Sequence, residues 1–397
     1  MKADPVGVLT GVHQLTGNEA CAEGALAAGC RFLGTYPIMP AVEICDRFLK
    51  RGRTVNATFV QMEDEISALA CVLGAVWTGK RAMSVTSGPG FSLMMEHIGL
   101  AVMLETPCVI VNVQHLGPGI GLVDQPAQGD MMQARWGSHG DYEVIALAPS
   151  SPQEMFNFTI KAFNLAERFR TPVMIMSDAN IAQLREEVII PSADEIEIEP
   201  RRYYEGPKDK YLPFKRDEDF VPRMVDIGQG YKFHVTGLTH DDRGYPIMFE
   251  ECQEYNVHPL VWKIRKNSDK IIDFTETRTE DAETIVISYG STTRIALKAV
   301  EEARRSGLKV GHLKLNTVWP FPDKRITELS KRIKGFVVPE INFGQIVFEV
   351  ERCNYGHTST YFVSIMGKEY DPTQSLLNAI DQALKGNSVK EGIIEIN

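Results

Sequence analysis

Short apolar runs alternate with amphipathic stretches through the first 190 residues, and this alternation limits the fold more than any other feature. Runs such as 107–114 and 171–178 lack the regular polar alternation of a half-exposed strand. Strands of this kind, separated by helices, form a parallel sheet that is covered on both faces. We therefore predict an α/β, doubly wound domain over residues 1–190. Its expected strands are 31–37, 56–62, 81–87, 107–114 and 171–178, and its expected helices are 18–29, 41–52, 63–79, 91–104 and 151–169.

The pattern stops at residue 191 and returns near residue 276. Residues 191–275 are rich in charge and proline, which predicts a connecting arm lying over a surface, with a short strand and a turn within 230–247. Residues 276–397 form a second, smaller α/β domain in this interpretation. Its expected strands are 283–291, 308–316 and 334–342, and its expected helices are 293–307, 323–333 and 374–385, with one more after residue 342.

The charge and cysteine content exclude several classes of protein. The 397 residues carry a net charge of −10, which argues against nucleic acid or an anionic membrane as the main partner. No apolar run reaches membrane-spanning length, and the first residues do not have the pattern of a signal peptide. The seven cysteines form no CxxC pair. We expect buried thiols, a cytoplasmic location, and neither a zinc site nor an iron–sulfur site in this chain.

The segment TSGPG (86–90) lies between a predicted strand and a predicted helix. A Gly-Pro-Gly turn at a strand's carboxyl end brings backbone amides close to a ligand, next to a helix N-terminus. No lysine follows, and the spacing is not that of a dinucleotide-binding fingerprint. Ligand contact and a simple tight turn both remain open.

The segment GTYPIMP (34–40) has two prolines around a short apolar run. Proline fixes φ and holds the preceding residue extended, so the segment can form a rigid pocket wall. A plain connector between strand and helix is the more common explanation of the pattern.

Three carboxylates open the helix predicted in QMEDEISA (61–68). A favourable interaction with the helix dipole accounts for one or two of them. Glu65 also begins the apolar stripe, which is expected to run through Ile66, Leu69, Ala70, Leu73, Val76 and Trp77. A desolvated carboxyl at this position would have a raised pKa and could share a proton with a ring nitrogen.

A glycine-rich loop of more than ten residues follows the strand that ends in VNVQ, and His115 lies where that strand stops. Long loops in compact domains are often functional, although a single histidine is more often structural. All four segments follow predicted parallel strands, and open α/β sheets build their sites at that edge. There is no nucleophile elbow, metal-ligand cluster or complete phosphate loop, so part of any active site is expected on another chain.

These motifs resemble the alpha subunit of the thiamine-diphosphate-dependent 2-oxoacid:ferredoxin (acceptor) oxidoreductases. The opening helix with its Tyr-Pro-Ile motif, VQMEDEISALACVLGA, SVTSGPGFSLMMEHIGLA, VNVQHLGPGIGL and QGDM follow one another in the family's order. HVTGLTHDDRGYP resembles the family's linker. LKLNTVWPFP and VVPEINFGQ resemble its transketolase-C-terminal-like domain.

The resemblance implies a pyrimidine-binding role for residues 1–190. The glutamate aligned with Glu65 contacts N1′ of the aminopyrimidine in that family and assists deprotonation of the thiazolium carbon. Residues expected at the cofactor are Tyr36, Pro37, Ile38, Ser87, Gly88 and Pro89. The resemblance also implies a beta subunit that carries the diphosphate, Mg²⁺ and a [4Fe-4S] cluster, with gamma and delta-type subunits. Coenzyme A is the implied co-substrate, and ferredoxin, or NAD through a flavin subunit, is the implied acceptor.

Two positions depart from the family. A substrate-binding threonine is replaced by Met39, and an arginine that pairs with the substrate carboxylate is replaced by His115. Together with Leu116, these changes predict a more apolar pocket and a branched or aromatic 2-oxo acid, such as a phenylglyoxylate-like one. Arg31 is a candidate for the missing cation. Pyruvate, 2-oxoglutarate or oxalate remain alternatives.

The same departures leave two other functions open. One is a non-catalytic structural subunit of such a complex, against which Glu65 argues. The other is a thiamine enzyme that decarboxylates without oxidation, and cluster-bearing partners would count against it.

Overall fold

The computed structural model describes residues 1–367, 371–386 and 393–396. The main sheet of the N-terminal part is parallel, apart from β13, which runs antiparallel to β7, and the short β6 (Leu122–Pro126), which runs antiparallel to β5. The strand order is β13 (Thr317–Trp319), β7 (Ile145–Leu147), β8 (Val173–Asp178), β5 (Val109–Leu116), β4 (Arg81–Thr86), β2 (Cys30–Thr35) and β3 (Thr58–Gln61).

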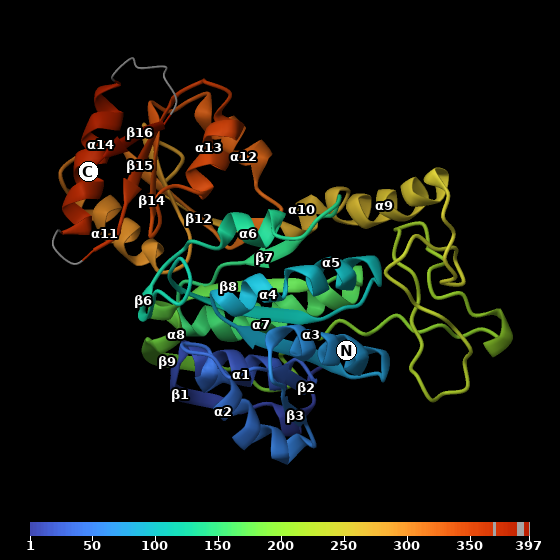
Figure 1. Cartoon of the computed structure of the whole chain (residues 1–397). Coiled ribbons are helices and arrows are strands. Elements are labelled where there is room, and N and C mark those ends of the chain that lie inside the picture. The colour runs from blue at the N-terminus through green and yellow to red at the C-terminus, as the bar shows by residue number, and fades with distance from the viewer. Residues whose placement is uncertain (368–370, 387–392, 397) are drawn as a thin grey trace.

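Helices cover both faces of this sheet, as the apolar runs predict (Figure 1). Val85, Val111 and Ile175 point to one face, which is covered by α1 (Gly17–Ala27), α2 (Val42–Gly52), α7 (Pro152–Phe169) and α8 (Ala179–Gln183). Ala82, Ile110 and Met174 point to the other face, which is covered by α3 (Glu65–Trp77), α4 (Pro89–Leu93), α5 (Met95–Met103) and α6 (Met131–Trp136). The doubly wound arrangement is therefore confirmed.

Local sequence explains where several helices begin. Thr16 and Glu19 form a reciprocal capping box at α1. Ser151 caps α7 by accepting a hydrogen bond from the Glu154 amide, and Pro152 follows at the first helical position. These polar contacts satisfy amides that would otherwise lack partners at the helix start.

The apolar stripe predicted for α3 is wrong at two positions. Ile66 is 42% exposed and Ala70 is also exposed. The helix instead buries Glu65, Ala68, Leu69, Val72, Leu73, Ala75, Val76 and Trp77. The buried face begins at Glu65 itself, so the carboxyl lies against the protein while Ile66 faces outward.

The sequence does not reveal two antiparallel pairings. β1 (Gly11–Thr16) pairs with β9 (Arg185–Ile190) in a separate ribbon. β6 (Leu122–Pro126) folds back on the end of β5, which turns part of the expected long loop into a hairpin.

The chain between β9 and β10 is mainly irregular and is seen as the green-yellow loops in Figure 1. It contains no strand, so the strand predicted within 230–247 is wrong; only an isolated bridge joins His240 to Pro246 there. The helices α9 (Glu250–Arg265) and α10 (Ser268–Ile271) complete this region. Lys263 of α9 and Arg216 of the irregular chain both form ion pairs with the buried carboxylate of Glu105. These ion pairs hold this region against the main sheet domain.

The C-terminal part is a second α/β unit, as expected. Its strand order is β10 (Phe274–Thr277), β12 (Val310–Leu315), β11 (Thr284–Ser288), β14 (Gly335–Glu340), β15 (Ser359–Ser364) and β16 (Ile393–Ile396), with β10 alone antiparallel to its neighbour among these described strands. One face packs on α11 (Thr292–Arg305) and α14 (Pro372–Lys385). The other packs on α12 (Asp323–Ser330) and α13 (Ile346–Asn354).

The cysteines are free thiols, and burial raises the pKa of Cys21, Cys30 and Cys108 to about 12. Five of the seven cysteines are buried, as expected, whereas Cys71 and Cys252 are partly exposed. Within the part of the chain that the structure describes, no helix is both long enough and apolar enough to cross a membrane.

Candidate active site

Glu65 is the first residue of α3, at the carboxyl edge of the main sheet. Asp64 caps this helix by accepting a hydrogen bond of 2.7 Å from the Ser67 amide. Asp64 therefore serves the helix start, and the Glu65 carboxyl remains free for another role. Glu65 is only 4% exposed, and burial raises the pKa of its carboxyl, with the charge of Asp64 adding to the increase.

The turn between β4 and α4 packs against Glu65. A Cβ placed on Gly90 would overlap both Oε1 of Glu65 and Oγ1 of Thr86. The Thr86 hydroxyl is buried and has no hydrogen-bond partner among the described residues. A carboxyl and a hydroxyl thus flank Gly90, and neither is used by another side chain.

His115 lies on the other side of the same turn. A Cβ on Gly88 would lie 2.7 Å from Nε2 of His115, and Gly88 has a φ of +43°, in the region that favours glycine. The His115 ring is buried, and its Nδ1 lies 3.1 Å from the Leu116 carbonyl oxygen. Ser87 anchors the turn by donating a hydrogen bond from Oγ to the Val113 carbonyl.

The segment from Tyr36 to Met39 follows the end of β2 and lies at the same edge of the sheet. Thr35 donates a hydrogen bond of 2.8 Å from Oγ1 to the Val85 carbonyl, which ties the end of β2 to the end of β4. Tyr36 is 40% exposed and Met39 is 49% exposed, whereas Pro37 and Ile38 are partly buried. Tyr36 and Met39 therefore present apolar surface at this edge.

The structure brings the four predicted segments together at one edge of the sheet. Arg31 is not part of this group. It lies at the start of β2, near the opposite end of the strand, where it pairs with Asp4 at 3.1 Å and donates hydrogen bonds to two carbonyls of its own neighbourhood.

Asp130 was not singled out from the sequence. Its carboxylate accepts a hydrogen bond of 2.8 Å from Asn112 on β5, and its backbone amide donates to Oε1 of Gln114. Burial raises the pKa of Asp130, and Asn112 and His115 oppose this effect. Asp130 lies in the QGDM block of the sequence, but nothing in that block predicts that Asp130 contacts β5.

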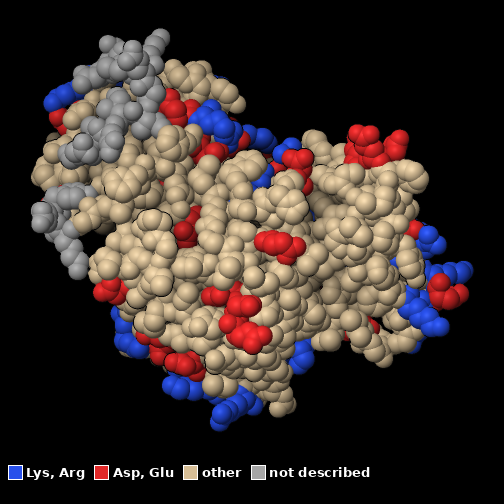
Figure 2. Space-filling model, in the orientation of Figure 1, with Lys and Arg blue, Asp and Glu red and all other residues tan. Residues whose placement is uncertain are grey.

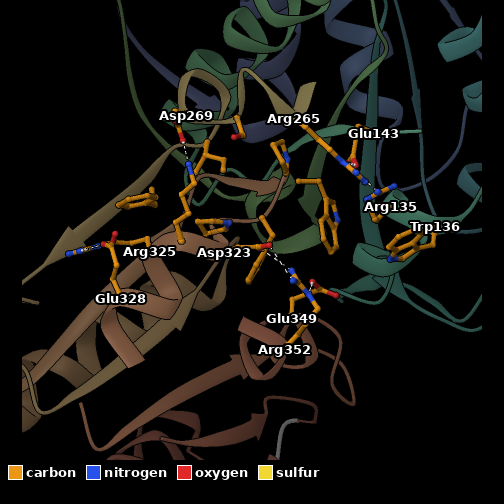
Figure 3. A pocket seen from close by; sticks show the side chains of 18 residues that line it. Arg135, Trp136, Glu143, Arg265, Asp269, Asp323, Arg325, Glu328, Glu349 and Arg352 are labelled. Carbon is orange, nitrogen blue, oxygen red and sulfur yellow. Dashed lines mark hydrogen bonds and ion pairs between the residues drawn. The ribbon is translucent and has the colours of Figure 1, made fainter. Parts of the chain in front are cut away.

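A pocket of about 900 Å³ lies elsewhere, between α6, α10, β13 and α12 (Figure 3). Its floor contains Phe274, Trp319 and Phe321, and its charged groups are paired with one another. Arg135 and Arg265 both contact Glu143, as Figure 3 shows. None of the site residues predicted from the sequence lines this pocket. Among residues 1–367, 371–386 and 393–396, no group of three or more His, Cys, Asp or Glu is arranged to hold a metal ion.

Comparison with known families supplies the decisive observation. Residues 23–256 match the family described as pyruvate flavodoxin/ferredoxin oxidoreductase, thiamine diP-binding. The chain belongs to the 2-oxoacid:ferredoxin oxidoreductases. Residues 282–374 match a second domain of the same enzymes, described as pyruvate:ferredoxin oxidoreductase core domain II.

Full-length relatives place this oxidoreductase chain among the alpha subunits. It is 48% identical to the 2-oxoglutarate synthase subunit KorA of Methanothermobacter thermautotrophicus, over 94% of this chain and 99% of the relative. It is 35% identical to the ketoisovalerate oxidoreductase subunit VorB of Methanothermobacter marburgensis, over 93% of this chain and 97% of the relative.

A solved oxidoreductase has the same fold. The 2-oxoglutarate:ferredoxin oxidoreductase from Magnetococcus marinus, with 2-oxoglutarate, coenzyme A and succinyl-CoA bound, superposes with a TM-score of 0.87 at 30% identity. The match covers 94% of this chain, which spans 66% of the length of that solved chain.

Proposed function

We propose that this alpha subunit holds the aminopyrimidine half of thiamine diphosphate at the Glu65 edge, within a complex that oxidatively decarboxylates 2-oxoglutarate to a coenzyme A thioester. One observation carries the proposal. Glu65 is a buried carboxyl with a raised pKa, it opens α3 at the carboxyl edge of the sheet, and no other described side chain hydrogen-bonds to it.

The residues at this edge suit an aminopyrimidine ring. A carboxyl whose pKa is raised by burial is protonated more often, so Glu65 can share its proton with a ring nitrogen. The Thr86 hydroxyl beside it offers a second polar contact. Tyr36 and Met39 offer apolar surface to a ring. When bound, thiamine diphosphate supplies the carbon nucleophile and the electron sink that decarboxylation of a 2-oxo acid requires.

The substrate proposal differs from the sequence expectation of a branched or aromatic acid. The relative named for 2-oxoglutarate is 48% identical to this chain, and the relative named for ketoisovalerate is 35% identical. Met39 is half exposed, so this chain by itself does not form a closed apolar pocket around it. His115 at the same edge offers a ring nitrogen to a substrate carboxylate.

Partner subunits complete this proposal. A beta subunit would carry the diphosphate, Mg²⁺ and a [4Fe-4S] cluster, with gamma and delta-type subunits and ferredoxin as the acceptor. Apolar side chains are exposed around the Glu65 edge, namely Tyr36, Met39, Ile66, Leu93, Ile120 and Leu122. Figure 2 shows that the surface around α3, α4 and α5 has Asp and Glu groups but few Lys or Arg, so a partner with basic groups would suit it.

The catalytic proposal is tested by Glu65→Gln in the assembled complex. We expect kcat to fall by about a hundredfold or more, because the amide cannot exchange a proton with the ring nitrogen. Glu63→Gln is the matched control, since Glu63 is an exposed acid two residues away. Activity close to that of the wild type in Glu65→Gln would reject the proposal and favour a structural subunit.

The substrate proposal is tested separately by kcat/KM of the wild-type complex with 2-oxoglutarate, pyruvate, 2-oxoisovalerate, phenylglyoxylate and oxalate. A clear preference for 2-oxoglutarate supports it. A preference for the branched or aromatic acid would restore the apolar-pocket hypothesis.

A further inference from the structure

Residues 127–132, which we call the bridging segment, form several hydrogen bonds to the C-terminal unit. Gln128 is 1% exposed, and its amide donates to the Tyr289 carbonyl at 2.9 Å and accepts from the Ile341 amide at 3.0 Å. Its backbone carbonyl accepts from Asn342 at 2.7 Å, and its backbone amide donates to the Ile341 carbonyl at 2.9 Å. Every polar group of Gln128 is therefore bonded to the C-terminal unit.

The neighbours of Gln128 are held in the same way. The Gln345 side chain accepts from the Met132 amide at 2.9 Å and donates to the Gly129 carbonyl. Trp319 donates from Nε1 to the Met131 carbonyl at 2.8 Å. The C-terminal unit thus fixes the backbone of the bridging segment from Gln128 to Met132.

The other side of the bridging segment is bonded to β5. Asp130 contacts both Asn112 and Gln114, which are alternate residues on that strand, and Gln114 immediately precedes His115. Figure 1 shows α6, which begins in this segment, at the junction of the two units. The bridging segment therefore links the C-terminal unit to the end of β5, which also pairs with β4, β6 and β8.

Glu65 is held by different contacts. It starts α3 after β3, is capped there by Asp64, and packs on Gly90. None of the hydrogen bonds of the bridging segment reaches α3. The hydrogen bonds of the bridging segment therefore act on the His115 side of the candidate site, whereas Glu65 is held by the start of α3 and by Gly90.

We propose that Gln128 and Gln345 are positioning residues for substrate recognition, because through them the C-terminal unit holds the bridging segment and the His115 end of β5 in place. This inference rests on the proposed function, which puts the substrate at His115 and the cofactor ring at Glu65. Loosening the bridging segment then weakens binding of the 2-oxo acid and leaves binding of thiamine diphosphate unchanged.

The two units stay joined without these side chains. β13 continues the main sheet beside β7, and Lys161 pairs with Asp273 at 2.6 Å. Arg294 pairs with Glu186 at 2.7 Å across the two units. Gln128→Ala is consequently expected to fold. Gln345→Ala, at a partly exposed position, is a milder second variant.

The test uses the assembled complex carrying Gln128→Ala or Gln345→Ala. We expect KM for the 2-oxo acid to rise about fivefold to tenfold, because each variant loses one or two buried hydrogen bonds. The dissociation constant of thiamine diphosphate is expected to stay within about twofold. Arg294→Ala is the control, since it removes an exposed contact between the same two units and should change neither value.

Equal loss of substrate and cofactor affinity, or no change in either, would overturn the proposal. Amide hydrogen exchange supplies a readout that does not need turnover. The variants are expected to speed exchange in residues 112–116 relative to Arg294→Ala, and unchanged exchange there would overturn the proposal as well. A wild-type complex that turns over no 2-oxo acid refutes the proposed function, whereas the exchange result still decides whether the C-terminal unit holds β5.

Discussion

Gly90 packs against the carboxyl of Glu65 so closely that a single added carbon at position 90 would occupy the space of Oε1. The carboxyl therefore requires glycine at this position. The position of Glu65 is set by this contact on one side and by the start of α3 on the other.

Gly90→Ala should displace the Glu65 carboxyl, because the obstructing atoms are Oε1 at the end of the flexible Glu65 side chain and Oγ1 of Thr86. We expect kcat to fall at least tenfold and the free energy of unfolding to fall by about 1–3 kcal/mol. Steady-state kinetics of the complex and urea unfolding of the chain measure the two effects. Gly74→Ala on α3 is the control, since a Cβ there meets nothing within 4 Å and alanine favours a helix by about 1 kcal/mol. Equal behaviour of the two variants would contradict the prediction.

Gly88→Ala should act on the other side of the turn. The residue has a φ of +43°, and its Cβ would lie 2.7 Å from Nε2 of His115. We expect a rise of tenfold or so in KM for the 2-oxo acid, with a loss of about 1–3 kcal/mol in stability. Gly74→Ala on α3, where a Cβ meets nothing within 4 Å, should leave KM unchanged. An unchanged KM in Gly88→Ala would show that His115 does not contact the substrate.

The ionisation of Glu65 should make the folded chain less stable as pH rises. Burial raises the pKa of this carboxyl above its ordinary value of 4.5, so the folded state holds its proton longer than the unfolded state does. Stability from this group is complete below pH 4.5 and is lost as pH rises through the higher folded pKa. Glu65→Gln removes this loss, so its stability relative to the wild type should grow from pH 4.5 upward in urea unfolding series. A difference independent of pH would show that Glu65 is not desolvated.

Glu105→Gln should destabilise the fold severely. Glu105 and Lys263 are fully buried and lie 2.9 Å apart, with Arg216 at 3.2 Å from the same carboxylate. Removing the single acid leaves these cations without compensation, which costs about 3–5 kcal/mol for a buried pair. Asp269→Asn breaks the exposed pair with Lys324 and should cost no more than about 1 kcal/mol. Urea unfolding compares the two, and equal losses would contradict the prediction.

The effect of Glu105 should also depend on pH. Burial alone would raise the pKa of its carboxyl, but Lys263, Arg216 and Arg170 outweigh burial and hold the pKa below its ordinary value of 4.5. The stabilisation is present above pH 4.5 and is lost as pH falls through the lower folded pKa. The difference between wild type and Glu105→Gln should therefore shrink in acid.

The sequence predicts the parallel strands well because burial on both faces is a local property. The apolar run 171–178, for example, becomes the fully buried β8. The pairing of Gly11 with Ile190 cannot be predicted in this way, since neither segment indicates its partner. The division of the chain at residues 190 and 275 stays a prediction.

The same distinction applies to the site. Glu65 could be found because a carboxylate at the start of a buried helix face is visible in the local pattern. Gln128 could not, because its partners Tyr289, Ile341 and Asn342 lie more than 160 residues away in the sequence. Arg31 was a poor candidate for a related reason, since its place at the start of β2 put it at the wrong end of the strand.

The antiparallel strand Thr317–Trp319 belongs to the C-terminal half of the chain but completes the edge of the N-terminal sheet. A chimera made by joining two paralogues near residue 275 would exchange this edge strand together with the downstream half. A cut after Trp319 would keep this edge strand but divide β10, β11 and β12 from β14 in the second sheet. Recombination that preserves both sheets must therefore restore the original three residues, and swaps made at the apparent boundary should yield poorly expressed, aggregation-prone hybrids.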